Sequence, residues 1–228
     1  RLAKIIANDT PVPLAPIPKI VLHLVPYSAL AITARSSVVD LSNIQNDNAL
    51  LALTGYDPVR RPNFDGYLAF ERAADNKASS YFQIFRTGAL EAVEADLLEP
   101  RSDGGLIIPS FSLEEKLIEA VNQYLHFLNR RGIFPPIVIM LSLLGVYGYN
   151  MELPPDMYRM RAFPLERDVY LFSEVLVEDA AVEPELLMRP VFDTLWNAVG
   201  RVESPYYDPI TGRRRPGRAG RHPPSRRS

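Results

Sequence analysis

The segment from Asn63 to Leu98 constrains the fold of this chain more than any other part of the sequence. It holds two runs of aromatic and β-branched residues, Phe64–Phe70 and Tyr81–Arg86, and a third mixed run, Ala89–Leu98. Residues of these types are enriched in β-strands. The two-residue turn Thr87-Gly88 brings the last two runs together in opposite directions. The segment therefore predicts an antiparallel meander of three strands.

Three further apolar runs predict strands, and two amphipathic segments predict long helices. The strands are expected at Lys19–Pro26, Ile137–Leu144 and Arg167–Val177. The first long helix is expected at Leu113–Arg130, because apolar residues recur there at helical spacing. The second is expected at Pro184–Val199.

The ends of the first long helix carry their own signals. Ser112 and Glu115 have the spacing of a capping box, and Gly132 follows the basic pair Arg130-Arg131 as a C-terminal glycine. A shorter helix is expected around Asp47–Leu53. Together these elements predict an α+β fold, a mainly antiparallel sheet with two long helices packed on it.

We expect the chain to have three parts. Residues 1–18 would be the end of an upstream helix followed by a proline-rich linker, which implies a further domain before Arg1. Residues 19–200 would form a single α+β domain. Residues 201–228 would be a disordered tail rich in arginine and proline, because this tail has little apolar surface to bury.

Composition excludes several classes of protein. The chain has no cysteine, so it can form neither a disulfide framework nor a thiolate metal site. Its longest apolar run, Ile137–Val146, is much shorter than the roughly 18 residues that span a bilayer. No signal peptide is recognisable. We therefore expect a cytoplasmic protein without a membrane partner.

Charge is distributed unevenly along the chain. Residues 212–228 contain seven arginines and no acidic residue, which leaves 18 Lys and Arg against 27 Asp and Glu in residues 1–211. The tail could bind phosphates by counterion release without reading sequence, whereas the acidic body should repel them. The alternative is that the tail is only a solvated chain end. The candidate nucleic-acid-binding residues are Arg213, Arg214, Arg215, Arg218 and Arg221.

Few residues suggest catalysis or cofactor binding. His23 lies in a predicted strand on the face of Val21 and Val25, and a core position is the simplest interpretation. Glu91 and Glu94 fall on opposite faces of one strand, so they do not form a pair. No metal-binding, phosphate-loop or nucleophile motif occurs, so no catalytic, cofactor or metal residue is predicted.

The aromatic residues of the meander allow two interpretations. Tyr81 and Phe85 share one face of their strand, and Phe82 shares the other face with Ile84. Such a face could stack unpaired bases. Alternating aromatic residues in a meander more often form a hydrophobic core, and we take that as the expectation.

Six stretches of the chain, in order, carry a family resemblance: KIVLHLVPYSAL, NFDGYLAF, SYFQIFRTGALEAVEADLL, PPIVIMLSLLGVYGYNM, RDVYLFSEVLVED and RPVFDTLWNAVG. This succession resembles the region downstream of the DNA-binding module in bacterial proteins of the Schlafen/AlbA type, over about residues 1–207. The DNA-contacting module itself would precede Arg1. Such proteins are often labelled helix-turn-helix or ATP-binding proteins, but this segment has no phosphate-binding loop motif.

The resemblance implies a non-catalytic accessory or interaction domain of a nucleic-acid-binding bacterial protein. The alternatives are a nucleic-acid hydrolase and a small-ligand sensor domain. The expected partners are nucleic acid, reached through the tail or through an upstream domain, and a second copy of the chain. No cofactor is expected.

Overall fold

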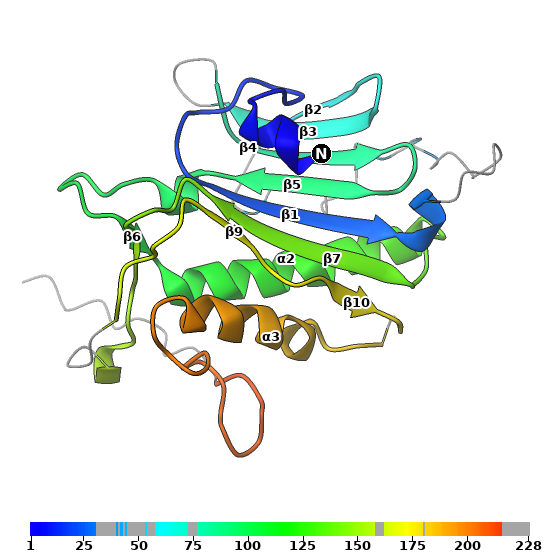
Figure 1. Cartoon of the computed structure of the whole chain (residues 1–228). Helices are drawn as coiled ribbons and strands as arrows, with labels where there is room; N and C mark the ends of the chain where they lie inside the picture. Colours follow the sequence, from blue (N-terminus) through cyan, green and yellow to red (C-terminus); the bar gives the residue numbers. More distant parts are fainter. Residues whose placement is uncertain are drawn as a thin grey trace, which may run out of the picture.

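The computed structural model contains one large antiparallel sheet with two long helices on one face and a short helix on the other (Figure 1). It describes residues 1–30, 40, 42, 44, 53, 58–72, 77–157, 162–179 and 181–215. The expected helix at 47–53 falls almost entirely outside these residues. Within them, no helix is both long enough and apolar enough to cross a membrane.

The main sheet has eight strands, and its continuous path runs β10-β7-β1-β5-β4-β3-β2, with β9 also pairing with β7. Every pair in it is antiparallel. A small second sheet pairs β6 with β8 in parallel. The strands are β1 (Lys19–Pro26), β2 (Val59–Pro62), β3 (Gly66–Arg72), β4 (Ala78–Phe85), β5 (Leu90–Glu94), β6 (Ile107–Ile108), β7 (Ile137–Leu144), β8 (Asn150–Met151), β9 (Val169–Leu171) and β10 (Val175–Val177).

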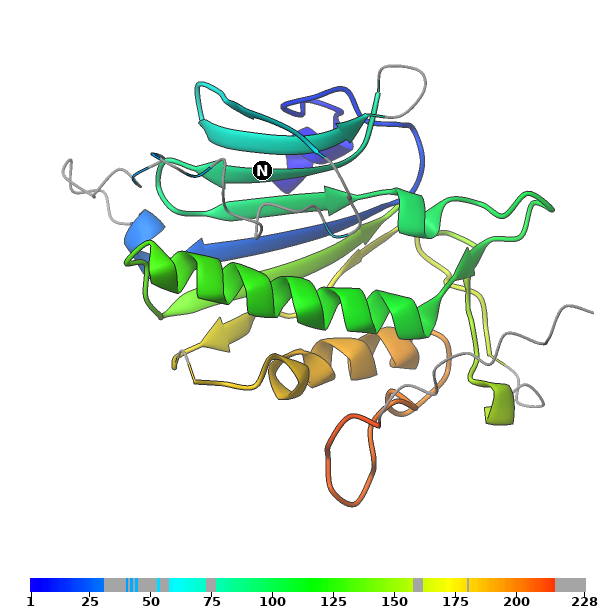
Figure 2. The same ribbon diagram turned by 180° about the vertical axis from the view of Figure 1, so that it is seen from behind.

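The two long helices both cover the same face of this sheet (Figure 2). They are α2 (Ser110–Arg130) and α3 (Pro184–Asn197). Side chains at helical spacing on α2, such as Leu117 and Tyr124, are buried against alternate strand residues, and the ring of Phe82 lies 5.0 Å from that of Tyr124. Trp196 of α3 is fully buried in the same core. The expected fold class is therefore confirmed.

The other face of the sheet is covered by the N-terminal segment. The short helix α1 (Leu2–Ile6) and the proline-rich stretch after it pack their apolar side chains, including Val12 and Leu14, on strands β1, β3, β4 and β5. Leu14 also forms a parallel bridge with Ala78 at the start of β4. Tyr81 is fully buried beneath this layer. Residues 1–18 are therefore part of the domain, and the expectation of a separate linker is wrong.

The C-terminal boundary also differs from the expectation. Residues 201–215 form a hairpin against the two helices, with a bridge between Tyr207 and Arg214 and with Ser204 buried. A disordered tail beginning at residue 201 is therefore wrong for this stretch, because its tyrosines and one arginine pack on the helices. Residues 216–228 lie outside the described part of the chain.

Most predicted elements match the structure, with two corrections. β1 and β7 have the expected bounds, and the expected strand at 167–177 is two short strands, β9 and β10, with Phe172 buried between them. The capping box is wrong, because α2 begins at Ser110, where the Pro109 carbonyl accepts a bond from Leu113 N at 2.9 Å. Gly132, with φ of 72°, ends α2 as expected.

Candidate functional site

The carboxylate of Glu91 organises the sheet face opposite the helices. Glu91 lies on β5, is fully buried, and accepts four hydrogen bonds from three side chains. Arg1 donates two of them, from Nε to Oε2 at 3.0 Å and from Nη2 to Oε1 at 2.7 Å. Tyr81 Oη donates to Oε1 at 2.8 Å, and His23 Nε2 lies 3.0 Å from Oε2. Each oxygen therefore has two partners.

These donors determine the charge state of Glu91. Burial alone would raise the pKa of this carboxyl, but the hydrogen bonds from His23, Arg1 and Tyr81 and the positive charge of Arg1 outweigh it. The result is a pKa of about 2. Burial and the nearby Glu91 charge also raise the pKa of Tyr81, so Tyr81 stays a neutral donor. Glu91 is thus a permanent anion at neutral pH, held by Arg1.

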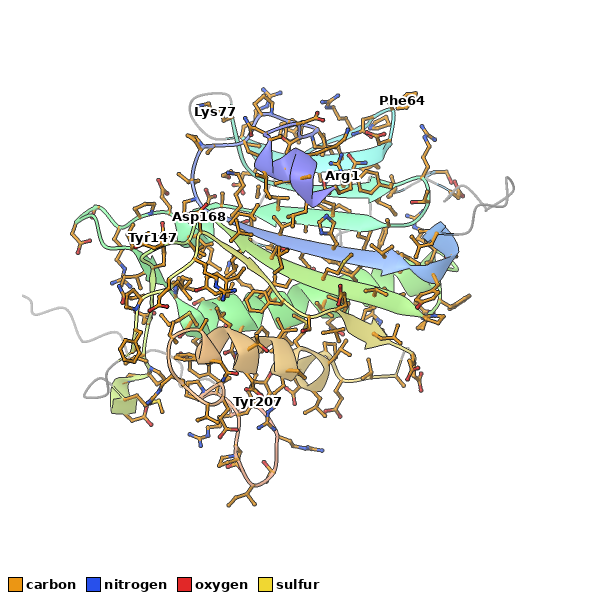
Figure 3. The ribbon with its side chains drawn as sticks, in the orientation of Figure 1. Arg1, Phe64, Lys77, Tyr147, Asp168 and Tyr207 are labelled. Carbon is orange, nitrogen blue, oxygen red and sulfur yellow. The ribbon has the colours of Figure 1, made fainter. Side chains whose placement is uncertain are left out.

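A pocket of about 580 Å³ opens beside this cluster, between Arg1 and the turns that join β2 to β3 and β4 to β5; Arg1 and Phe64 are labelled in Figure 3. We call it the Phe64 pocket. Its walls are mainly apolar and include Phe85 and Leu90, with His23 from the Glu91 cluster. Polar groups also line it, including Arg1, Asp65, Arg86 and Thr87.

Two turns beside the pocket are tied to each other. In the turn between β2 and β3, the Asn63 side chain accepts from Gly66 N at 2.8 Å and donates to Gln83 Oε1 at 2.6 Å. Arg86, in the turn between β4 and β5, donates from Nε to the carbonyl of Phe64 at 3.0 Å. The backbone of Phe64 is therefore fixed, although 93% of the residue's surface is exposed.

A second buried carboxylate, Glu114, lies in the helical layer. Its Oε1 accepts from Trp196 Nε1 at 2.9 Å and from Ser204 Oγ at 2.8 Å. Its Oε2 accepts from Arg214 Nη1 at 2.8 Å. Burial raises the pKa of Glu114, and these donors offset only part of the effect. This cluster joins α2, α3 and the C-terminal hairpin.

Arg214 is enclosed by aromatic rings as well as by its ion pair. Its guanidinium carbon lies 5.2 Å from the ring centre of Phe111, 5.7 Å from that of Tyr206 and 5.9 Å from that of Tyr207. Only 11% of its side chain is exposed. Such cation–π contacts, with the Glu114 bond, fix Arg214 to the helices. Arg214 is therefore a structural residue and is not free to bind phosphate.

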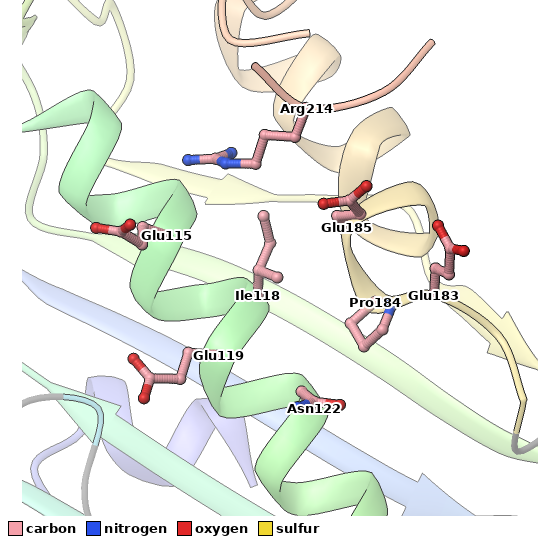
Figure 4. A pocket seen from close by; sticks show the side chains of 8 residues that line it. All are labelled: Glu115, Ile118, Glu119, Asn122, Glu183, Pro184, Glu185 and Arg214. Atoms are coloured by element: carbon pink, nitrogen blue, oxygen red, sulfur yellow. The ribbon is translucent and has the colours of Figure 1, made fainter. Parts of the chain in front are cut away.

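Two further hollows lie around this second cluster. One, of about 460 Å³, lies between α2 and α3 and is bordered by the carboxylates of Glu115, Glu119, Glu183 and Glu185 (Figure 4). In the same view the guanidinium of Arg214 points toward α2. The other, of about 820 Å³, lies between the 152–157 segment and the C-terminal hairpin.

The structure separates the five arginines predicted to bind nucleic acid. Arg213 and Arg215 are exposed on the hairpin, whereas Arg214 is paired with Glu114. Arg218 and Arg221 lie outside the described residues. Within the described ranges, no group of three histidine or acidic side chains could hold a metal ion.

The strand residues of the Glu91 cluster lie on the faces that the sequence predicts, but their partners come from distant parts of the chain. His23 is on the predicted strand face, yet its partner is the Glu91 side chain, which comes from a neighbouring strand. Glu91 and Glu94 lie on opposite faces, as expected. One feature of the sequence does point to this cluster. Strand alternation places the charged residue Glu91 on the same face as Val93 of its own strand and Tyr81 of the neighbouring strand, and a charged residue on an apolar face needs partners.

Comparison with known proteins adds no identification. The chain matches no family model, no curated protein and no solved structure. The resemblance to proteins of the Schlafen/AlbA type therefore stays a prediction.

Proposed function

We propose that this chain is a non-catalytic accessory domain of a cytoplasmic, nucleic-acid-associated bacterial protein, and that it acts by binding. The observation that carries the proposal is the state of its two buried clusters. Glu91 and Glu114 use their hydrogen-bonding capacity on side chains of the same chain. They also lie on opposite sides of the sheet. This is the arrangement of two structural anchors.

The same observation argues against the hydrolase alternative. A metal-dependent hydrolase needs several carboxylates that converge on one ion, and a nucleophilic hydrolase needs a base beside a hydroxyl or thiol. Among the described residues no group of histidine and acidic side chains could hold a metal ion. The hydroxyls of Tyr81 and Ser204 do lie beside the carboxylates of Glu91 and Glu114, but both residues are buried within the clusters, where a substrate cannot reach them. The pockets, by contrast, offer surfaces that could hold a ligand without reacting with it.

An assay for cleavage and binding together tests the proposal. The whole chain is incubated with labelled single-stranded DNA, duplex DNA and single-stranded RNA, with Mg²⁺ or Mn²⁺ present. We expect binding without cleavage. Cleavage that is lost in the Glu91→Gln or Glu114→Gln variant, while the variant remains folded, would refute the non-catalytic role.

The contribution of the tail can be tested with the hairpin left intact. Changing Arg213, Arg215, Arg218 and Arg221 to serine removes four charges but keeps Arg214 in its ion pair. If the tail binds phosphates, this variant should bind less tightly, and its salt dependence should be less steep by about 0.7 to 0.9 for each phosphate that it no longer binds. An unchanged slope would show that these arginines do not contribute.

A second copy of the chain as partner is tested by light scattering of the purified protein.

The small-ligand sensor is the second candidate, and one observation favours it. The Phe64 pocket combines an apolar interior with cationic, anionic and hydroxyl groups. Ligand pockets commonly have this composition and a volume of about 300–1,000 Å³. Thermal denaturation of the chain with a panel of small aromatic ligands would reveal such a site as a raised melting temperature.

A further inference from the structure

We infer that the Phe64 pocket binds one unpaired nucleotide, with its base against the rings of Phe64 and Phe85 and its phosphate at Arg86. The inference deepens the proposed function and rests on it only in taking nucleic acid as the ligand. It assigns binding to a defined place on the body of the domain rather than to the arginines of the tail.

Phe64 lines the pocket with 93% of its surface exposed. Such a ring gains apolar burial when a planar ligand covers it. Here the exposure is not a result of local flexibility. The Asn63–Gln83 amide pair and the Arg86 bond to the Phe64 carbonyl hold the turn in place. A ring on a braced turn loses little backbone entropy when it stacks on a base.

Phe85 lines the same pocket. Its ring is half-buried, and the Arg1 guanidinium lies over it at 5.2 Å from the ring centre. Arg1 is held there by its bidentate bond to Glu91. Phe85, Arg1 and the braced Phe64 turn therefore form one preorganised wall. Aromatic and guanidinium planes of this kind stack bases regardless of their identity.

The charges that line the pocket nearly balance. Arg1 is paired with Glu91, and Asp65 lies next to Arg86, whose backbone N–H donates to the Asp65 carbonyl at 2.9 Å, so the pocket carries no large excess of positive charge. Arg86 uses Nε for the Phe64 carbonyl, and its terminal nitrogens have no partner among the described residues. They can donate to one phosphate, while Asp65 can accept from an N–H group on the edge of a base, such as N3–H of thymine. A pocket of this composition favours a ligand ring that has polar groups at its edge. A ligand that offers only phosphates would bind the arginines of the tail instead.

The volume decides how much of a nucleic acid can enter. About 580 Å³ accommodates a ligand the size of one nucleotide. Stacked, paired bases of a duplex cannot insert, so the ligand must be a free mononucleotide or an unpaired nucleotide of a single strand. These two sources share the same chemistry, and binding measurements can separate them.

The test uses the full chain and two fluorescent strands of equal length, an oligothymidylate and an abasic strand with the same phosphates. Binding is measured by anisotropy for the unchanged chain and for the Phe64→Ala and Arg86→Gln variants. Phe134→Ala is the matched control, because Phe134 is also an exposed phenylalanine (61%) but does not line the pocket. Melting temperatures verify that all variants fold.

We expect Phe64→Ala to weaken binding of the oligothymidylate by about tenfold, the usual loss for one stacked base. Its affinity for the abasic strand should not change, and Phe134→Ala should bind both strands like the unchanged chain. Arg86→Gln should weaken binding of both strands, since it removes a cation that pairs with phosphate. Competition by thymidine monophosphate would identify a free nucleotide as a sufficient ligand, and its failure would identify the single strand.

Two results would overturn the inference. If the unchanged chain binds the intact and abasic strands equally, or if Phe64→Ala has no effect, the pocket does not hold a base. Binding would then belong to the tail, and the proposed function would stand. Cleavage of either strand would instead contradict the proposed function, whatever the pocket variants show. Absence of binding to all probes would overturn the nucleic-acid role as a whole.

Discussion

Replacing Glu91 with glutamine should remove a large part of the stability of this domain, and the loss should depend on pH. In the folded chain the pKa of Glu91 is about 2, against an ordinary value of 4.5. A tenfold change in proton affinity corresponds to about 1.4 kcal/mol, so the anion of Glu91 contributes about 3 kcal/mol at pH 7. Glu91 is completely buried, so solvent screening reduces this value little.

The direction of the pH dependence follows from the lowered pKa. The contribution is complete above pH 4.5, where Glu91 is ionised in both the folded and the unfolded chain. It is lost as the pH falls from 4.5 toward 2, because the unfolded chain then binds the proton more readily. Glu91→Gln should therefore be less stable than the unchanged chain at pH 7 and approach it in acid.

Urea unfolding followed by the fluorescence of Trp196, the one tryptophan of the sequence, measures this difference. A loss of about 3 kcal/mol corresponds to a fall in melting temperature of roughly 6–12 °C for a chain of this size. Glu115→Gln is the control, because Glu115 is an exposed residue of α2, and it should change stability by less than about 0.5 kcal/mol. A Glu91→Gln variant that loses less than about 1 kcal/mol at pH 7, or whose stability runs parallel to that of the unchanged chain into acid, would refute the reasoning.

Three further predictions concern the backbone and the second cluster. Gly66→Ala should cost more than about 1 kcal/mol, because the new Cβ would lie 2.0 Å from the carbonyl oxygen of Ile84. Gly104→Ala, also at positive φ but with no atom within 4 Å, should cost less in the same urea titration; equal losses would exclude the clash. Arg214→Leu should cost roughly 3–5 kcal/mol and shift Trp196 emission, because it leaves Glu114 buried without its cation; a loss below about 1 kcal/mol would contradict this. In hydrogen exchange, the amides of β7 should be among the slowest, since β7 is bonded to strands on both sides; faster exchange than in β2 would contradict that position.

Local patterns in the sequence were sufficient for the fold class and for most elements. The apolar runs of β1 and β7 predicted both strands with their observed ends, since long β-branched and leucine-rich runs have few alternative conformations. The helical spacing from Leu117 to Leu128 predicted α2, and Gly132 predicted where it ends, because a left-handed residue there favours glycine. The tight turn expected at Thr87-Gly88 predicted antiparallel pairing, and in the structure the turn runs over Arg86, Thr87 and Gly88, closed by the bond from Phe85 N to the Ala89 carbonyl at 2.9 Å.

Only the tertiary structure decided which polar residues meet and where the domain ends. Arg1 and Glu91 are 90 positions apart, and Glu114 and Arg214 are 100 positions apart, yet each pair shares a buried bond. No local pattern reports such pairs, because they depend on strand order and on how a chain end packs. For the same reason the sequence predicted residues 1–18 as a linker and residues 201–215 as a tail. In the structure the apolar side chains of the first segment pack on one face of the sheet, and the aromatic side chains of the second pack on the helices that cover the other face. Composition describes what a segment contains, whereas the surface that it can cover depends on the rest of the fold.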